Sequence, residues 1–299
     1  MELLIYLILF LLVLIVSSTT NKLLPFLPLP LVQILLGIVI GLFLPNTDFH
    51  LNTELFLALV IGPLLFRESE EADITAILKH WRIIIYLIFP VIFISTLSLG
   101  GLAHLLWFSL PLAACLAVGA ALGPTDLVAF ASLSERFSFP KRVSNILKGE
   151  GLLNDASGLV AFQVALTAWT TGAFSLGQAS SSLIFSILGG FLIGFLTAMT
   201  NRFLHSFLLS VRATDIASEL LLELSLPLVT FFLAEEVHVS GIIAVVVAGI
   251  LKASRFKKIT LLEAQVDTVT ETVWHTVNFM LNGSVFVILG MELEMIAEP

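Results

Sequence analysis

The chain has 299 residues, of which 58% are hydrophobic and 12% charged, with a formal net charge of −8 and a mean hydropathy of +1.06. Because soluble domains carry about 25% charged residues, this composition excludes a soluble globular protein. The apolar residues form long runs that approach the length needed to cross about 30 Å of hydrocarbon. Such runs must be helical in lipid, which offers the backbone no other hydrogen-bond partners.

We expect a polytopic all-α membrane protein of about ten transmembrane helices, with the helix ends uncertain by a few residues. The expected segments lie roughly at 2–17, 31–45, 53–66, 82–107, 110–132, 144–168, 178–201, 214–235, 238–252 and 271–291. The first run lacks a basic start and a small-residue cleavage site, so we interpret it as a retained helix. We expect Cys115 to be a small packed residue. No Cys/His pattern has metal-site spacing, and we expect no cofactor.

The basic residues indicate the orientation of the chain. All 14 Lys and Arg residues lie in or beside the odd-numbered connecting loops. Positive charge is retained in the cytoplasm, so this alternation predicts cytoplasmic odd loops and an N-terminus outside. We therefore expect a multi-pass protein of the cytoplasmic membrane, embedded in the lipid bilayer.

The run Gly123-Pro124-Thr125-Asp126 interrupts the fifth segment. Proline removes a backbone donor and clashes with the preceding turn. Broken helices expose carbonyls and half-helix ends, which transporters use to hold ions. The alternative interpretation is a simple proline kink, with Asp126 capping the following half-helix. The two interpretations are compatible, since a capping residue can also shape a site.

The run Glu150-Gly151-Leu152-Leu153-Asn154-Asp155 lies within the sixth segment. Carboxylates inside a membrane cost about 2.5–3.5 kcal/mol each on insertion scales, so Asp155 is the strongest functional candidate. Gly151 and Asp155 share a helix face. The small residues after Asp155 allow a close helix neighbour. In the alternative interpretation, Glu150, Asn154 and Asp155 form a solvated cytoplasmic mouth.

Other polar groups are weaker candidates. Glu219 and Glu223 lie one turn apart in the eighth segment, whereas Glu235 and Glu236 fit its outer end. The charged run 67–71, which includes Glu68, is interpreted as a solvated span end or as an acidic funnel that gathers cations. We interpret the histidines at positions 104, 205, 238 and 275 as packed or interfacial residues.

The pair Thr125-Asp126, followed by Asn154-Asp155 in the next span, resembles the monovalent cation:proton antiporter-1 family, the bacterial NhaP-type sodium/proton exchangers. The stretches 234–236, 240–249 and 286–290 are also similar to this family. The resemblance implies a single exchanger domain over 1–299, a first repeat at about 31–201 and a partial inverted second repeat at about 214–299. It also implies a broken helix near Pro124-Asp126 and a homodimer.

The resemblance further implies the roles of individual residues. Asp155 would bind either Na⁺ or a proton, with the cation as a transported ion. Thr125 and Asp126 would help to build the site, and Asn154 would mark the electroneutral branch. Glu150 would form a structural ion pair with an arginine on a later helix.

Several features depart from the family pattern. Gly151 replaces a serine that can supply a cation ligand, and Leu127 stands where a proline often follows the Thr-Asp pair. Arg67 stands where an acidic residue commonly follows the phenylalanine that matches Phe66, and Glu68 comes next. The family has about three more helices, so we expect a C-terminally truncated transporter whose Glu150 partner lies beyond Pro299. The alternative is that Glu150 is protonated or hydrated.

The sequence thus predicts a secondary antiporter, not an enzyme, that exchanges Na⁺, K⁺ or Li⁺ for H⁺ and has no nucleic-acid partner. Three alternatives stay open: a fragment that is inactive or depends on a partner, another solute carrier of inverted-repeat design, and an intramembrane aspartyl protease using Asp126 and Asp155.

Overall fold

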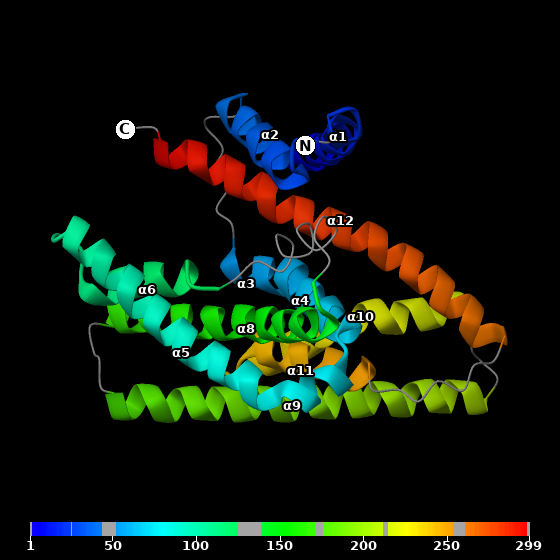
Figure 1. Cartoon of the computed structure of the whole chain (residues 1–299). Helices are drawn as coiled ribbons and strands as arrows, with labels where there is room; N and C mark the ends of the chain where they lie inside the picture. Colours follow the sequence, from blue (N-terminus) through cyan, green and yellow to red (C-terminus); the bar gives the residue numbers. More distant parts are fainter. Residues whose placement is uncertain are drawn as a thin grey trace. The chain divides into compact units, whose positions relative to one another are not determined.

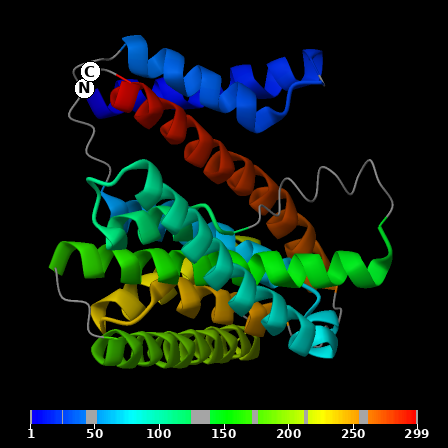
Figure 2. The ribbon, with the colours of Figure 1, turned by 60° about the vertical axis from the view of Figure 1, so that its left-hand side comes forward.

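The computed structural model describes residues 2–24, 26–43, 52–124, 139–171, 176–211, 215–253 and 261–297. Every regular element within these ranges is a helix (Figures 1 and 2). Thr125 and Asp126 lie outside the described residues. The prediction of an all-α fold is confirmed.

At least one helix overlaps each of the ten expected segments. The helices are α1 (Glu2–Leu23), α2 (Leu29–Phe43), the consecutive α3 (Thr53–Phe56), η1 (Leu57–Ile61) and α4 (Gly62–Glu71), then α5 (Ile74–Leu106), α6 (Leu112–Ala121), α8 (Lys141–Thr171), α9 (Leu176–Ser210), α10 (Ile216–Glu236), α11 (Gly241–Ala253) and α12 (Leu261–Ala297). Four stretches in the described residues are long and apolar enough to cross a membrane: 82–106, 185–210, 216–236 and 268–293. Five shorter apolar helices accompany them.

The chain divides into two compact units, residues 1–64 with 259–299 and residues 65–258. In the first unit, α2 packs along α12. Their backbones approach closely at Gly37 and Gly290, where a Cβ atom on either residue would meet the main chain of the other helix. Trp274 is buried in this unit. Small residues at such a crossing let two helices pack without the hydrophobic effect that drives packing in water.

In the second unit, α5, α6 and α8 form one group of packed helices. Ile84, Ile88 and Ile92 recur at every fourth position of α5 and form a buried cluster. This spacing puts them on one helix face, and Ile146 and Ala161 of α8 pack against them. The cluster therefore fixes α5 against the helix that carries the strongest candidate residues.

The second group in this unit consists of α9, α10 and α11. Thr230 on α10 donates a hydrogen bond of 3.0 Å to the Oγ1 atom of Thr197 on α9, and both side chains are buried. Glu235 accepts a hydrogen bond of 3.3 Å from the backbone N–H of Gly241 at the start of α11. Glu235 thus has the helix-end role that its position in the sequence favoured.

Helix α6 is shorter than the expected segment 110–132. It ends at Ala121, and residues 122–124 are not helical. The ending has a local cause, because Gly123 lowers helix propensity and Pro124 disfavours the α conformation at the residue before it. An interruption before Pro124 agrees with the expected break, and residues 125–138 lie outside the described part of the chain.

Candidate functional site

The polar candidates of α8 lie in its buried part. The side chain of Glu150 is 6% exposed, that of Asn154 is fully buried, and Gly151 is buried between them. Asn154 donates a hydrogen bond of 3.0 Å from Nδ2 to Oε1 of Glu150. The two residues are one helical turn apart, so this bond forms within the helix itself. Neither side chain lies at a solvated mouth in the described structure.

Asp155 follows Asn154 within the helical backbone of α8. Its side chain lies outside the described residues, as do Thr125 and Asp126. The structure therefore positions Asp155 by its backbone alone, next to the buried hydrogen bond between Glu150 and Asn154.

The broken end of α6 packs against α8 close to Asp155. Gly158, three positions after Asp155, faces Pro124, and a Cβ atom at position 158 would overlap the proline ring. Residues three positions apart are neighbours on a helix surface. The structure thus places Pro124, the residue before Thr125, against Gly158, which lies one turn from Asp155 in α8.

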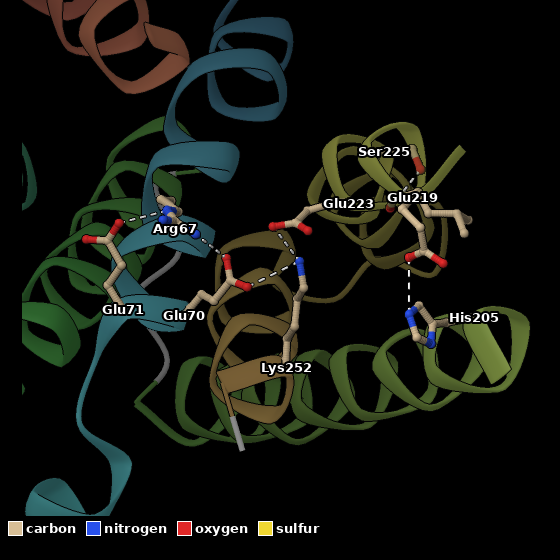
Figure 3. Close-up of polar contacts among 9 residues, drawn as sticks. Arg67, Glu70, Glu71, His205, Glu219, Glu223, Ser225 and Lys252 are labelled. Atoms are coloured by element: carbon tan, nitrogen blue, oxygen red, sulfur yellow. Dashed lines mark hydrogen bonds and ion pairs between the residues drawn. The ribbon is translucent and has the colours of Figure 1, made fainter. Parts of the chain in front are cut away.

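A group of charged residues lies at the C-terminal ends of α4 and α11 and in the first half of α10 (Figure 3). We call it the charge cluster; it comprises Arg67, Glu70, Glu71, Glu223 and Lys252. Arg67 pairs through Nη1 with Glu70 at 2.9 Å and through Nε with Glu71 at 2.7 Å. The Nζ atom of Lys252 lies 2.7 Å from Glu223 and 3.2 Å from Glu70.

The charge cluster changes the interpretation of the run 67–71 as a solvated span end. The side chains of Arg67, Glu70 and Glu223 are only 13–15% exposed, and that of Lys252 is 9% exposed. Glu71 is the exposed member, at 58%. The run is half buried because it is covered by α11, and Glu68 within it is half buried as well.

Glu219, the other acidic candidate of α10, lies apart from the charge cluster. Its carboxylate is 3.2 Å from Nε2 of His205 on α9, and both side chains are mostly buried (Figure 3). His205 therefore packs against an acid, which its sequence context did not indicate. Glu219 and Glu223 lie one turn apart but contact different helices.

Sequence reasoning missed Lys252 as a buried cation. The only available signal was that Lys252 follows the apolar run 241–251 without a polar spacer. By its position at the end of an apolar segment, Lys252 is expected beside the ninth connection, where a lysine usually extends its ammonium group to the interface.

The chain is similar to known proteins over nearly its whole length. The family model described as "Sodium/hydrogen exchanger, transmembrane" matches residues 7–298. A "Sodium, potassium, lithium and rubidium/H(+) antiporter" of Bacillus subtilis (strain 168) is 38% identical over 278 residues, which is 93% of this chain and 42% of that protein. An uncharacterized Na(+)/H(+) exchanger of Escherichia coli (strain K12) is 32% identical over 306 residues, covering 100% of this chain and 54% of that protein.

The fold is also similar to that of a solved antiporter. The structure of the sodium proton antiporter MjNhaP1 from Methanocaldococcus jannaschii at pH 8 superposes with a TM-score of 0.74 at 20% identity. The match covers 97% of this chain and 71% of that protein. This chain thus spans less than half the length of the Bacillus relative and about seven tenths of MjNhaP1.

Proposed function

Because the chain belongs to the sodium/hydrogen exchanger family, whose members are secondary transporters and not enzymes, we propose that it exchanges a monovalent cation for H⁺ across the cytoplasmic membrane. Na⁺ is the first candidate cation, with K⁺ and Li⁺ next, because the Bacillus subtilis relative is named for all three. The observation that carries the proposal is the position of Asp155 in α8, between the buried Glu150–Asn154 hydrogen bond and the contact of Gly158 with Pro124.

The proposed mechanism needs a single carboxylate for which two cations compete. Asp155 binds either a proton or the metal cation, because a proton on the carboxyl removes the charge that holds the cation. A rise in proton concentration therefore expels the cation, and a rise in cation concentration expels the proton. Alternating access then exposes whichever species is bound to the other side of the membrane, as in other inverted-repeat carriers.

The neighbouring residues have supporting roles in this proposal. Thr125 and Asp126 line the ion site from the broken helix, and Gly151 leaves room on the Asp155 face of α8. Glu150 is held by Asn154 as a structural acid. Asn154 is neutral where a second carboxylate would carry another charge, so one cation exchanges for one proton.

The arrangement of basic residues supports an N-terminus outside. In the second unit, Arg67 and Lys252 both pair with Glu70, and Arg202 donates a hydrogen bond of 3.3 Å to the carbonyl of Leu251. The third, seventh and ninth connections therefore meet at one end of this unit. Such grouping is expected if all odd connections are cytoplasmic. We further propose a homodimer in the bilayer.

Cation-dependent proton flux in proteoliposomes tests the proposal. The purified chain should acidify or alkalinise the vesicle lumen in response to a Na⁺ gradient, and Asp155→Asn should abolish this response. Glu54→Gln is the matched control, because Glu54 is an exposed acid in the first turn of α3. Its flux should equal that of the wild type.

A second measurement does not require transport. If Asp155 exchanges a proton for a cation, Na⁺ added to the detergent-solubilised chain in weak buffer should release protons. Asp155→Asn should release none, and Glu54→Gln should behave as the wild type. A wild-type chain that neither transports nor releases protons with Na⁺, K⁺ or Li⁺ would overturn the proposal.

A further inference from the structure

Lys252 bridges two helices that are distant in the sequence. Its Nζ atom lies between Glu70 of α4 and Glu223 of α10, at 3.2 Å and 2.7 Å (Figure 3). Its side chain is 9% exposed, and both carboxylate side chains are 15% exposed. Removal of one partner from a buried charge network is strongly destabilising, since it leaves charge without compensation. The ammonium group of Lys252 therefore links α4 to α10.

Helix α11 contacts α4 at two further points, through the backbone at Gly249 and through Lys252 over the ring of Phe66. Gly249, one turn before Lys252, faces the carbonyl of Phe66, and a Cβ atom on Gly249 would lie 2.8 Å from the Cβ atom of Ser69. The Nζ atom of Lys252 is 5.5 Å from the centroid of the Phe66 ring, within cation–π range. Two successive turns of α11 thus hold residues 66–70.

Glu68 lies in the middle of the segment that is held in this way. Arg67 and Glu70 on either side of it are paired with each other at 2.9 Å, and one carboxylate oxygen of Glu68 is buried. When the residues on both sides of one helical position are held by contacts, the direction of the side chain at that position is fixed as well. The contacts of α11 with residues 66–70 therefore fix the position of Glu68.

We infer that Lys252 is a positioning residue, which fixes α4 and its carboxylate Glu68 against α10 and α11 and so sets the affinity for the transported cation. This inference rests on the proposed antiport function and adds a residue outside α6 and α8 to it. Without Lys252, Glu70 and Glu223 repel each other, α4 separates from α10, and Glu68 moves. Cation affinity then falls, while the exchange carboxylate in α8 keeps its own surroundings.

The kinetic test compares KM and maximum rate for Na⁺ in proteoliposomes. Lys252→Met should raise KM by about tenfold with a smaller change in maximum rate, because misplacement of a positioning group weakens binding. Lys252→Arg should restore KM, since it keeps the charge and can bridge both acids. Lys22→Met, at an exposed lysine near the end of α1, is the matched control and should leave KM unchanged.

A second substitution separates a charge effect from a folding defect. Glu70→Gln added to Lys252→Met removes the repulsion with Glu223 and should bring KM back to within about threefold of the wild type, a smaller loss than that of an unpaired buried charge. A general folding defect would not recover when a second buried group is changed. If KM stays raised in the double variant, or never rises in Lys252→Met, the inference is overturned.

A spectroscopic distance distinguishes failure of this inference from failure of the proposed function. Spin labels at Ala72→Cys and Leu221→Cys, in a Cys115→Ala background, report the separation of α4 and α10 within one unit. Lys252→Met should lengthen or broaden this distance, and Lys22→Met should not. A changed distance in a chain that shows no antiport would reject the function and keep the positioning role. An unchanged distance would reject the role itself.

Discussion

Asn154 donates a hydrogen bond from Nδ2 to Oε1 of Glu150, one turn earlier in α8, and both side chains are buried. The bond satisfies part of a carboxylate that has little access to solvent. It also fixes the direction of the Asn154 side chain beside Asp155. A polar pair of this kind stabilises the helix only as long as both members are present.

Asn154→Ala should therefore lower the free energy of unfolding by about 1–3 kcal/mol, because the buried Glu150 loses a donor. Thermal unfolding in detergent measures this change. Thr167→Ala, on the exposed part of the same helix, is the control and should have a much smaller effect. Equal stability of Asn154→Ala and the wild type would show that the bond does not contribute.

The ten helical segments were predictable because each depends on its own apolar run. A membrane helix satisfies its backbone internally, so a stretch such as 216–236 forms a helix whichever neighbour it meets. The end of α6 at Ala121 was also predictable from local sequence, because Gly123 and Pro124 follow two residues later. The expected segment 110–132 continues past Pro124 because its leucines and alanines are still apolar, and residues 125–138 lie outside the described part of the chain.

The charge cluster was not predictable in this way. Lys252 and Glu70 come from segments at opposite ends of the second unit's sequence, and they meet because α11 packs onto α4, as at Gly249. A charged run at a span end has the same sequence pattern whether it is solvated or covered by another helix. The roles of Asp155, Thr125 and Asp126 stay predictions, since the described residues include only the backbone of Asp155.

The proposed one-to-one exchange has an electrical consequence. If one cation exchanges for one proton, no net charge crosses the membrane, and a transmembrane potential does no work on the cycle. Moving a single net charge would instead couple to about 2.3 kcal/mol per 100 mV. The rate of Na⁺-dependent proton flux should thus be the same at imposed potentials of either sign, set with gradients of a permeant anion because K⁺ is itself a candidate substrate, and measured at equal pH gradients. A rate that changes with potential would contradict electroneutrality.

The hydrogen bond between Thr230 and Thr197 joins α10 to α9 at a buried position. Thr230→Val keeps the side-chain shape and removes the donor, so stability should fall by about 0.5–1 kcal/mol, the usual worth of such bonds between membrane helices. Adding Thr197→Val should then cost little more, because the partner is already lost. Thr170→Val, whose hydroxyl is exposed, serves as the control. Fully additive losses in unfolding measurements would argue against coupling.

The contact of Gly158 with Pro124 predicts opposite outcomes for two glycines. Gly158→Ala places a methyl group against the proline ring, so α6 and α8 must separate and stability should fall by about 1–3 kcal/mol. Gly101→Ala meets nothing within 4 Å and should be neutral or stabilising by up to about 1 kcal/mol, through better helix propensity. Thermal unfolding of the two variants side by side measures both changes. Similar values for the two would contradict the packing of α6 on α8.

Asp215 predicts a pH dependence of stability at the start of α10. It accepts a hydrogen bond of 2.8 Å from the backbone N–H of Ser218 within a capping box. The hydrogen bonds from the side chain and backbone of Ser218 lower the pKa of Asp215 below its ordinary value of 3.8. A lowered pKa in the folded state gives stability that is fully present above the unfolded pKa and is lost as pH falls through the folded one.

The melting temperature of the wild type relative to Asp215→Asn should therefore stay constant above about pH 5 and decline below about pH 4, because the asparagine caps the helix without titrating. Ser218→Ala removes the side-chain hydrogen bond, the larger of the two causes of the lowered pKa, and keeps the backbone N–H. The difference in melting temperature between Ser218→Ala and the double variant Asp215→Asn, Ser218→Ala should therefore depend less on pH than the difference between the wild type and Asp215→Asn. Melting curves between pH 3 and pH 7 measure both differences. A wild-type advantage that grows as pH falls has the wrong sign and would exclude the cap as its source.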